Sequence, residues 1–138
     1  MTSALPYAEV IGDPIAQSKS PAIHRFWLDA LAIEGEYRAT QVMRADFKAY
    51  LALRRADPAW CGCNVTMPLK LDALLAADDA SDSATAAGAA NLLTFRDGKL
   101  VAANTDVDAV RDLVSPLARD SVTILGNGGA ARAVLLAL

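Results

Sequence analysis

Short apolar runs alternate with amphipathic stretches along the first half of the chain. The apolar runs predict three strands, at residues 8–12, 37–43 and 60–66. Apolar side chains at helical spacing follow each run and predict three helices, which begin near Ser20, Asp46 and Pro68. The third strand is apolar almost throughout, so we expect it at the centre of a sheet that is covered on both faces.

The second half of the chain continues the alternation and adds a hairpin. Asp97-Gly98 lies between two apolar segments, 91–95 and 99–103, and this dipeptide is a strong signal for a tight antiparallel turn. Further elements are predicted in order: a short helix at 78–87, a helix at 106–117, a strand at 121–125 and a helix from Gly128 to Leu138. The pattern predicts an α/β fold with a mostly parallel twisted sheet, helices on both faces and one antiparallel hairpin, followed by the first βα unit of a Rossmann domain.

Composition excludes several classes of protein. The 138 residues are 54% hydrophobic and 21% charged, which is typical of a globular domain with a proper core. No apolar run approaches the roughly 18 residues that span a bilayer, and the first residues lack an export signal, so we expect a cytoplasmic protein that contacts no membrane. A net charge of −3 gives no reason to expect nucleic-acid binding.

The residue types that most often bind metals are few. Cys61 and Cys63 lie two apart on a predicted strand, so we expect them to pack there without forming a disulfide or a metal site. His24 is the single histidine and has no identifiable catalytic partner in the sequence. We interpret it as partly exposed helix surface.

Lys70 and Asp106 combine an amine with a carboxylate, 36 positions apart. Each comes where a predicted strand gives way to a helix, and residues at the ends of parallel strands gather at one edge of a sheet. An ammonium held by a carboxylate is a ready proton donor for a carbonyl that is being reduced. Residues 126–131, Gly-Asn-Gly-Gly-Ala-Ala, follow an apolar strand and begin a helix, which is the context that a dinucleotide-binding turn requires. Together these features suggest a dehydrogenase.

Each candidate residue also has a simpler interpretation. Lys70 could be a surface lysine, although the helix dipole opposes a cation in the first turn. Ser18 and Ser20 could bind a carboxylate together with backbone amides, or Ser20 could only cap its helix. Asn91 could be a turn residue, and residues 104–106 could form an ordinary helix cap.

Six motifs, taken together, resemble the shikimate dehydrogenase family in order and spacing, across essentially all of the chain. They are residues 10–14 (VIGDP), 18–21 (SKSP), 64–70 (NVTMPLK), 88–91 (GAAN), 104–106 (NTD) and 126–132 (GNGGAAR). The resemblance implies reversible reduction of 3-dehydroshikimate to shikimate with NADPH, a step in the biosynthesis of aromatic amino acids.

The resemblance also implies roles for individual residues. Lys70 and Asp106 match the catalytic pair. The substrate-binding positions are Ser18 and Ser20 on the carboxylate, with Asn64, Thr66, Lys70, Asn91 and Asp106 around the ring. The positions that would contact the cofactor are Gly126, Asn127, Gly128, Gly129 and Ala130 at the diphosphate, with Asp82 toward the nicotinamide end.

Three departures from the family pattern leave alternatives open. The chain has Ala90-Asn91-Leu92 where the family usually has Val-Asn-Thr, Val107 where Gly usually follows Asn-Thr-Asp, and Asn127 where Ala is common. The catalytic pair is intact, but quinate or a related acid remains open as the substrate, and NAD remains open beside NADP. The alternative from another class is a non-catalytic module that binds a shikimate-like acid.

The expected division is a substrate-binding and catalytic domain at residues 1–106, followed at 107–138 by a linking helix and the start of an NAD(P)-binding Rossmann domain. A nucleotide-binding sheet needs several βαβ units, and about one is present. We therefore interpret the chain as the front part of a longer protein and expect these residues alone to be inactive. The expected partner is a small-molecule substrate, and the expected assembly is a monomer or a homodimer.

Overall fold

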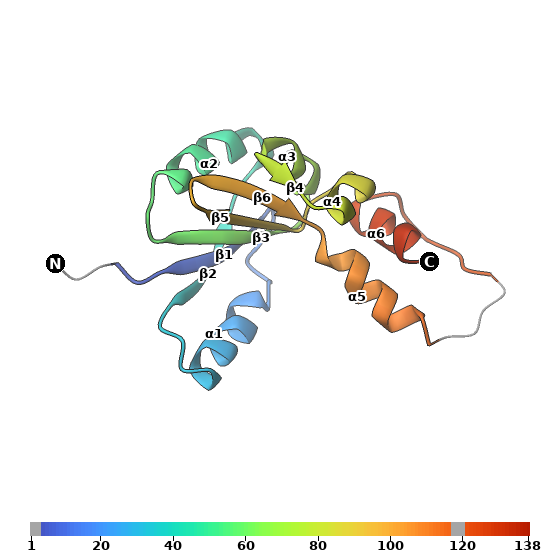
Figure 1. Ribbon diagram of the computed structural model, residues 1–138, viewed down its shortest axis with the longest axis horizontal. Coiled ribbons are helices and arrows are strands. Elements are labelled where there is room, and N and C mark those ends of the chain that lie inside the picture. Colours follow the sequence, from blue (N-terminus) through green and yellow to red (C-terminus); the bar gives the residue numbers. More distant parts are fainter. Residues whose placement is uncertain (1–3, 117–120) are drawn as a thin grey trace.

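The computed structural model describes residues 4–116 and 121–138, and a single six-stranded sheet organises them (Figure 1). The strand order across the sheet is β2-β1-β3-β5-β6-β4. The strands are β1 (Tyr7–Gly12), β2 (Glu36–Gln41), β3 (Trp60–Val65), β4 (Asp79–Ala80), β5 (Leu92–Arg96) and β6 (Lys99–Ala103). Only β5 runs against its neighbours, β3 and β6, so the other five strands share one direction.

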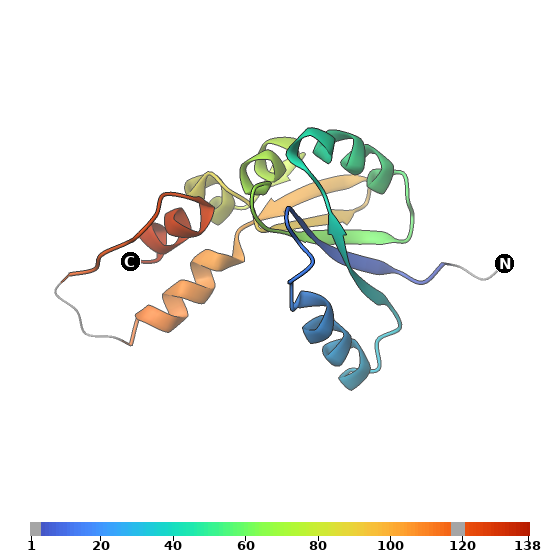
Figure 2. The same ribbon diagram turned by 180° about the vertical axis from the view of Figure 1, so that it is seen from behind.

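The helices lie in three places around this sheet. They are α1 (Ser20–Ala30), α2 (Phe47–Arg55) after a 3₁₀ turn (Arg44–Asp46), α3 (Lys70–Ala76), α4 (Asp82–Ala87), α5 (Thr105–Val114) and α6 (Gly129–Ala137). Figures 1 and 2 show α2 and α3 over one face of the sheet and α1 on the other, while α4, α5 and α6 gather beyond one end of the strands. The predicted α/β class, with helices on both faces and one antiparallel hairpin, is confirmed.

The main core lies between the sheet and the helices α2 and α3. Its fully buried side chains come from central strands and from the segment that leads into α3, and they include Ile11, Leu69, Leu93 and Leu100. The apolar character of β3 therefore reflects its central place, as predicted. Within the described part of the chain, no helix has both the length and the apolar composition needed to cross a bilayer.

A charged residue is buried in this core. Glu9 on β1 is fully buried, and its carboxylate accepts hydrogen bonds from Arg54 Nε at 2.6 Å, from the Tyr50 hydroxyl at 2.7 Å and from the Thr40 hydroxyl. Burial alone would raise the pKa of Glu9, but the hydrogen bonds from these three partners outweigh it and lower the pKa below its usual range. The network therefore holds a charged carboxylate inside the protein and ties α2 to β1 and β2.

Three sequence-based predictions of local structure need correction. Residues 78–87 are not one helix: residues 79–80 form a short strand beside β6, and α4 begins only at Asp82. Residues 121–125 are not a strand in the structure, because a strand requires a hydrogen-bonded neighbour and none of the described residues pairs with them. The end of the helix predicted at 106–117 lies partly outside the described residues; α5 begins at Thr105 and ends at Val114.

The residues predicted to start α1 and α2, Ser20 and Asp46, lie at or next to the N-cap positions, but neither caps its helix with its side chain. Lys19 is the N-cap position of α1, and Ser20 is its first helical residue. Asp46 is the N-cap residue of α2, as predicted, but its side chain makes no capping hydrogen bond. The Ser20 hydroxyl has no hydrogen-bond partner among the described residues, so α1 does not use it.

We predict that Arg54→Met destabilises the protein by about 3–5 kcal/mol, because the substitution leaves the Glu9 carboxylate buried without its cation. Urea unfolding followed by circular dichroism measures the change. The matched control is Arg111→Met on α5, which breaks an ion pair with Asp108 whose side chains are both exposed, and it should change little. Equal effects of the two substitutions would contradict the role assigned to Glu9.

The lowered pKa of Glu9 also predicts a pH dependence. A carboxyl group with a lower pKa in the folded state stabilises the fold fully above its unfolded pKa of about 4.3, and this contribution is lost as the pH falls through the folded value. The difference in unfolding free energy between wild type and Glu9→Gln should therefore be constant from pH 7 to about pH 5 and shrink in more acidic buffer. Urea unfolding of both proteins at a series of pH values from about 7 down to about 3 tests the prediction. A difference in unfolding free energy that stays constant over the whole series would contradict it.

Candidate active site

The reversed direction of β5 brings polar segments from several loops to one edge of the sheet. The carboxyl ends of β1, β3 and β6 lie at this edge, and so does the amino end of β5. Asn91 immediately precedes β5, and residues 104–106 immediately follow β6. The backbone amide of Asn91 donates to the carbonyl of Ala103 at 3.0 Å, which places the two segments side by side.

Lys70 and Asp106 meet at this edge. The Nζ atom of Lys70 lies 2.5 Å from Oδ2 of Asp106, although the two residues are 36 positions apart. Lys70 is the first residue of α3, and Asp106 is the second residue of α5. Their side chains are 19% and 33% exposed, so both reach solvent. The backbone carbonyl of Lys70 also accepts a hydrogen bond from Ala90 at 2.8 Å, which fixes the start of α3 next to Asn91.

Asn91 holds the carboxylate from its other side. Its Nδ2 atom donates to Oδ1 of Asp106 at 2.8 Å and to the Thr105 hydroxyl at 2.9 Å, while its Oδ1 accepts from the Thr105 amide at 2.9 Å. Both carboxylate oxygens of Asp106 therefore have a partner, one from Asn91 and one from Lys70. This arrangement restricts the rotation of the carboxylate and fixes where the ammonium lies.

Asn104 fixes the start of α5. Its side chain is buried, accepts a hydrogen bond from the Asp106 amide at 3.1 Å and donates one to the Ala89 carbonyl at 2.9 Å. The predicted cap at residues 104–106 is thus present, and it joins α5 to the segment before β5. Residues 104–106 therefore form an ordinary helix cap and also contribute to the polar cluster around Lys70.

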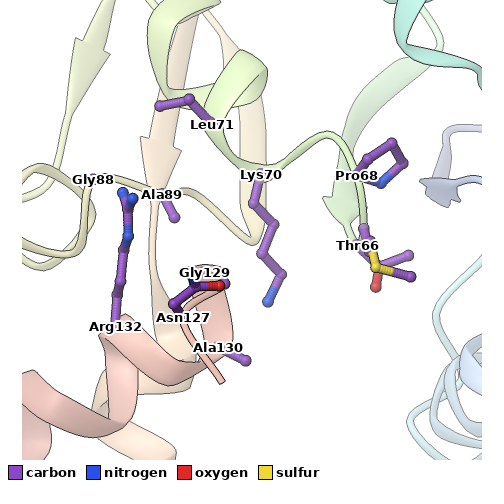
Figure 3. Close-up of a pocket in the computed structure, with 12 residues that line it drawn as sticks. Thr66, Pro68, Lys70, Leu71, Gly88, Ala89, Asn127, Gly129, Ala130 and Arg132 are labelled. Atoms are coloured by element: carbon purple, nitrogen blue, oxygen red, sulfur yellow. The ribbon is translucent and has the colours of Figure 1, made fainter. Parts of the chain in front are cut away.

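A cavity of about 450 Å³ opens beside Lys70 (Figure 3). Residues after β3, residues before β5 and the glycine turn all contribute to its wall: Thr66, Met67, Pro68, Lys70, Leu71, Gly88, Ala89, Asn127, Gly128, Gly129, Ala130 and Arg132. In Figure 3 the Lys70 side chain extends from the start of α3 toward the turn at Asn127 and Gly129. The glycine turn and the predicted catalytic lysine therefore share one cavity.

Gly129 brings the turn close to the side chain of Lys70. A Cβ atom at this position would lie 3.1 Å from Cδ of Lys70 and 3.2 Å from Cβ of Ala89. Glycine thus allows α6 to begin directly against the lysine side chain. Ala133, one turn later, is fully buried against Ala87 and Val107, and this packing holds α6 in place.

The start of α6 has the properties of an anion site. No side chain among the described residues caps this helix, so its first amide groups are available to a ligand. Apart from their chain neighbours, no atom of the described residues lies within 4 Å of the places where Cβ atoms of Gly126 and Gly128 would stand, so a ligand could approach the backbone there. Arg132 adds a cation to the cavity wall. These residues fit a diphosphate group.

The predicted site residues Ser18, Ser20, Asn64 and Asp82 are not among the residues that line this cavity. The turn before Ser18 and Ser20 touches the segment after β3, because the Asp13 amide donates to the Met67 carbonyl at 3.0 Å. The Ser20 amide donates to the Ser18 hydroxyl at 3.3 Å.

Asn64 accepts a hydrogen bond from the Tyr37 hydroxyl at 2.6 Å and lines a second cavity, between α1 and the sheet. Asp82 is exposed at the start of α4 and is not among the residues that line either cavity.

Several residues at the site were not anticipated from the sequence. Thr105 and Arg132 belong to motifs noted in the sequence but had no role assigned to them, and Tyr37 was predicted only as part of a strand. His24 is partly exposed on α1, as interpreted, but it also has contacts that the sequence did not indicate: its ring stacks on Tyr37 with 3.8 Å between centroids, and its Nδ1 atom lies 2.9 Å from the Ser20 carbonyl. The alternation of strand and helix could not reveal the contact between His24 and Tyr37, because it joins two different elements, α1 and β2.

This geometry is suited to proton transfer. A restrained carboxylate holds an ammonium at the wall of a cavity, where it can donate a proton to a substrate oxygen or stabilise negative charge on it. The local helix does not favour this position for a lysine, since the dipole of α3 opposes a cation at its first residue. The described residues contain no group of three or more His, Cys, Asp or Glu side chains arranged to hold a metal ion.

Comparison with known proteins adds independent information. Residues 10–93 match the family model for the shikimate dehydrogenase substrate binding domain. A shikimate dehydrogenase (NADP(+)) of Sphingopyxis alaskensis is 52% identical over 98% of this chain and 50% of its own length. The chain thus spans about half the length of the curated relatives it matches.

Solved structures agree with the sequence comparison. Shikimate 5-dehydrogenase of Thermus thermophilus, in complex with shikimate, superposes with a TM-score of 0.81 at 33% identity, covering 96% of this chain and 51% of that one. A shikimate dehydrogenase in complex with NADP+ superposes with a TM-score of 0.84 at 31% identity, covering 94% of this chain and 46% of that one.

We predict that Lys70→Met changes the free energy of unfolding by no more than about 1 kcal/mol. The ion pair is partly exposed, water can replace the ammonium at Asp106, and loss of a cation at the start of α3 offsets part of the cost. Urea unfolding measures the effect, with Arg54→Met as the reference for a buried pair. A loss as large as that of Arg54→Met would show that the pair serves stability instead.

Proposed function

The chain belongs to the shikimate dehydrogenase family, and from this premise we propose that the protein containing it catalyses the reversible reduction of 3-dehydroshikimate to shikimate with NADPH. The observation that carries the proposal is the Lys70–Asp106 pair at the wall of a cavity that also includes the glycine turn. The reaction would serve the biosynthesis of aromatic amino acids.

The proposed roles in the chemical step follow from the geometry. NADPH, when bound, supplies the hydride that reduces the substrate carbonyl. The Lys70 ammonium donates a proton to the oxygen as negative charge develops on it, and in the reverse direction the neutral amine takes this proton back. The Asp106 carboxylate, held by Asn91, positions the ammonium for this proton transfer.

The proposed substrate contacts combine the family resemblance with the local hydrogen bonds. Ser18 and Ser20 would bind the substrate carboxylate; the Ser20 hydroxyl is available because α1 does not use it as a cap. Around the ring, the contacts would come from Asn64, Thr66, Lys70, Asn91 and Asp106. Thr66 and Lys70 already share the cavity wall.

The proposed cofactor is NADP, with its diphosphate at the start of α6. The uncapped amides of α6, the open backbone at Gly128 and the cation of Arg132 support this assignment. The contacts would come from Gly126, Asn127, Gly128, Gly129 and Ala130. The exposed position of Asp82 outside the cavity offers its proposed contact with the nicotinamide end no support.

We retain the proposed division into a substrate-binding and catalytic domain at residues 1–106 and the start of a cofactor domain at 107–138. The chain leaves β6 at Ala103 and enters α5, which carries Asp106 and leads away from the sheet toward α6. The proposed boundary therefore follows Asp106, a residue that serves the site of the first part and lies on the helix that leads into the second. Asp106 positions Lys70, and α5, the helix that carries Asp106, packs against α6.

In the full-length protein we predict that Lys70→Met lowers kcat for shikimate oxidation by about 10²- to 10⁴-fold while KM changes little, because the proton-transfer group is lost and the other substrate contacts remain. The rate is followed by nicotinamide absorbance with shikimate and NADP+. Lys48→Met, at an exposed position on α2, is the control and should keep the wild-type rate. A near-normal kcat for Lys70→Met would refute the proposed role.

The same assay, together with a measurement of shikimate binding, distinguishes the alternative functions. A preference for quinate or for NAD+ would change the substrate or cofactor assignment and leave the role of the Lys70–Asp106 pair in place. Shikimate binding measured by calorimetry, without turnover of shikimate or quinate by the full-length wild-type protein, would instead establish a non-catalytic binding module.

A further inference from the structure

Tyr37 reaches across the sheet to one of the proposed substrate-binding residues. It lies on β2 opposite Ala8, while Asn64 lies on β3 opposite Val10, and β1 runs between them. Ala8 and Val10 are two positions apart and therefore share a face of β1. The Tyr37 side chain crosses β1 on this face, and its hydroxyl donates to Oδ1 of Asn64 at 2.6 Å.

The ring of Tyr37 has little freedom to move. The residue is only 4% exposed and packs with Val10 and Ile15 beneath α1. His24 of α1 stacks on the ring, with an interplanar angle of 10°. The Nδ1 atom of His24 donates to the Ser20 carbonyl at 2.9 Å, and it must carry the proton there because a carbonyl only accepts. The stacked pair thus connects the Ser20 segment to Asn64.

The hydrogen bond determines what Asn64 offers to a ligand. A carboxamide has an accepting oxygen and a donating nitrogen, and Tyr37 occupies the oxygen. No described residue accepts a hydrogen bond from Nδ2 of Asn64, and the residue is partly exposed on a cavity of about 520 Å³ between α1 and the sheet. Burial is the main cause that raises the pKa of Tyr37, and the nearby Cys63 and Glu9 raise it further. Its hydroxyl therefore stays protonated and remains a donor.

We propose that Tyr37 is a positioning residue that holds the Asn64 carboxamide in one orientation, so that Asn64 presents its amino group to an accepting oxygen of the substrate. This inference rests on the proposed function and deepens it. It assigns the donor in this contact and makes recognition depend on a side chain that does not itself touch the substrate. Without the Tyr37 hydroxyl, the carboxamide can rotate, and the orientation that binds substrate is populated only part of the time.

The test is a double-mutant cycle in the full-length protein, with Tyr37→Phe, Asn64→Ala and the double variant. Tyr37→Phe keeps the ring that stacks on His24 and removes only the hydroxyl. It should raise KM for shikimate by about 3- to 10-fold, the effect expected for loss of one hydrogen bond, with kcat and the KM for NADP+ nearly unchanged. In the Asn64→Ala background the same substitution should have no further effect on KM, because the group through which it acts is absent.

The matched control is Tyr7→Phe. Tyr7 is equally buried, on the adjacent strand β1, and its hydroxyl donates to Asp57 at 2.8 Å, away from the proposed substrate residues. This variant should leave KM for shikimate unchanged, which separates loss of a buried hydroxyl in general from loss of this one.

The outcomes separate the inference from the proposed function. An equal rise in KM on removing the Tyr37 hydroxyl in both backgrounds, or no rise in either, would overturn the positioning role while wild-type turnover upholds the dehydrogenase. A wild-type protein that neither turns over nor binds shikimate would overturn the proposed function and the inference with it.

Discussion

The direction of a single strand determines where the functional groups of this protein meet. In a sheet in which every strand ran the same way, the residue before β5 would lie at the edge opposite the end of β6. Because β5 is antiparallel to both of its neighbours, Asn91 lies beside residues 104–106 and can hold Asp106. The tight turn at Asp97-Gly98 that reverses the chain is far from the site, yet the geometry of the Lys70–Asp106 pair depends on it.

The ion pairs Glu9–Arg54 and Lys70–Asp106 differ in burial, and this difference matches a structural role for the first pair and the proposed chemical role of the second. The Glu9 carboxylate is fully enclosed and is held by three donors, which suits a fixed charge that joins α2 to the sheet. The Lys70–Asp106 pair is only partly enclosed and faces a cavity. Lys70 can therefore contact a ligand in the cavity, whereas the environment of Glu9 holds its charge constant near neutral pH.

The departures from the family pattern have different structural settings. Val107, where the family usually has glycine, is almost fully buried and packs with Ala87 and Ala133, so it helps to dock α6. Asn127 lies in the cavity wall beside the glycines, where its side chain adds a polar group near the proposed diphosphate. Leu92 is partly buried at the start of β5 and lines the same cavity as Asn64 and Tyr37. Two of the three changes therefore line cavities, and one lies in the packing.

The sequence by itself determined the class of fold, the hairpin, the central place of β3 and the candidate residues Lys70, Asp106 and Asn91. These follow from periodicity, turn chemistry and motif order, which are local properties of the chain. Only the tertiary structure decided that Asn91 orients Asp106, that Gly129 packs against Lys70 and that Tyr37 reaches Asn64 over β1. It also decided that residues 121–125 form no strand and that residues 79–80 do, because a strand exists only through pairing with another segment, which no local pattern encodes.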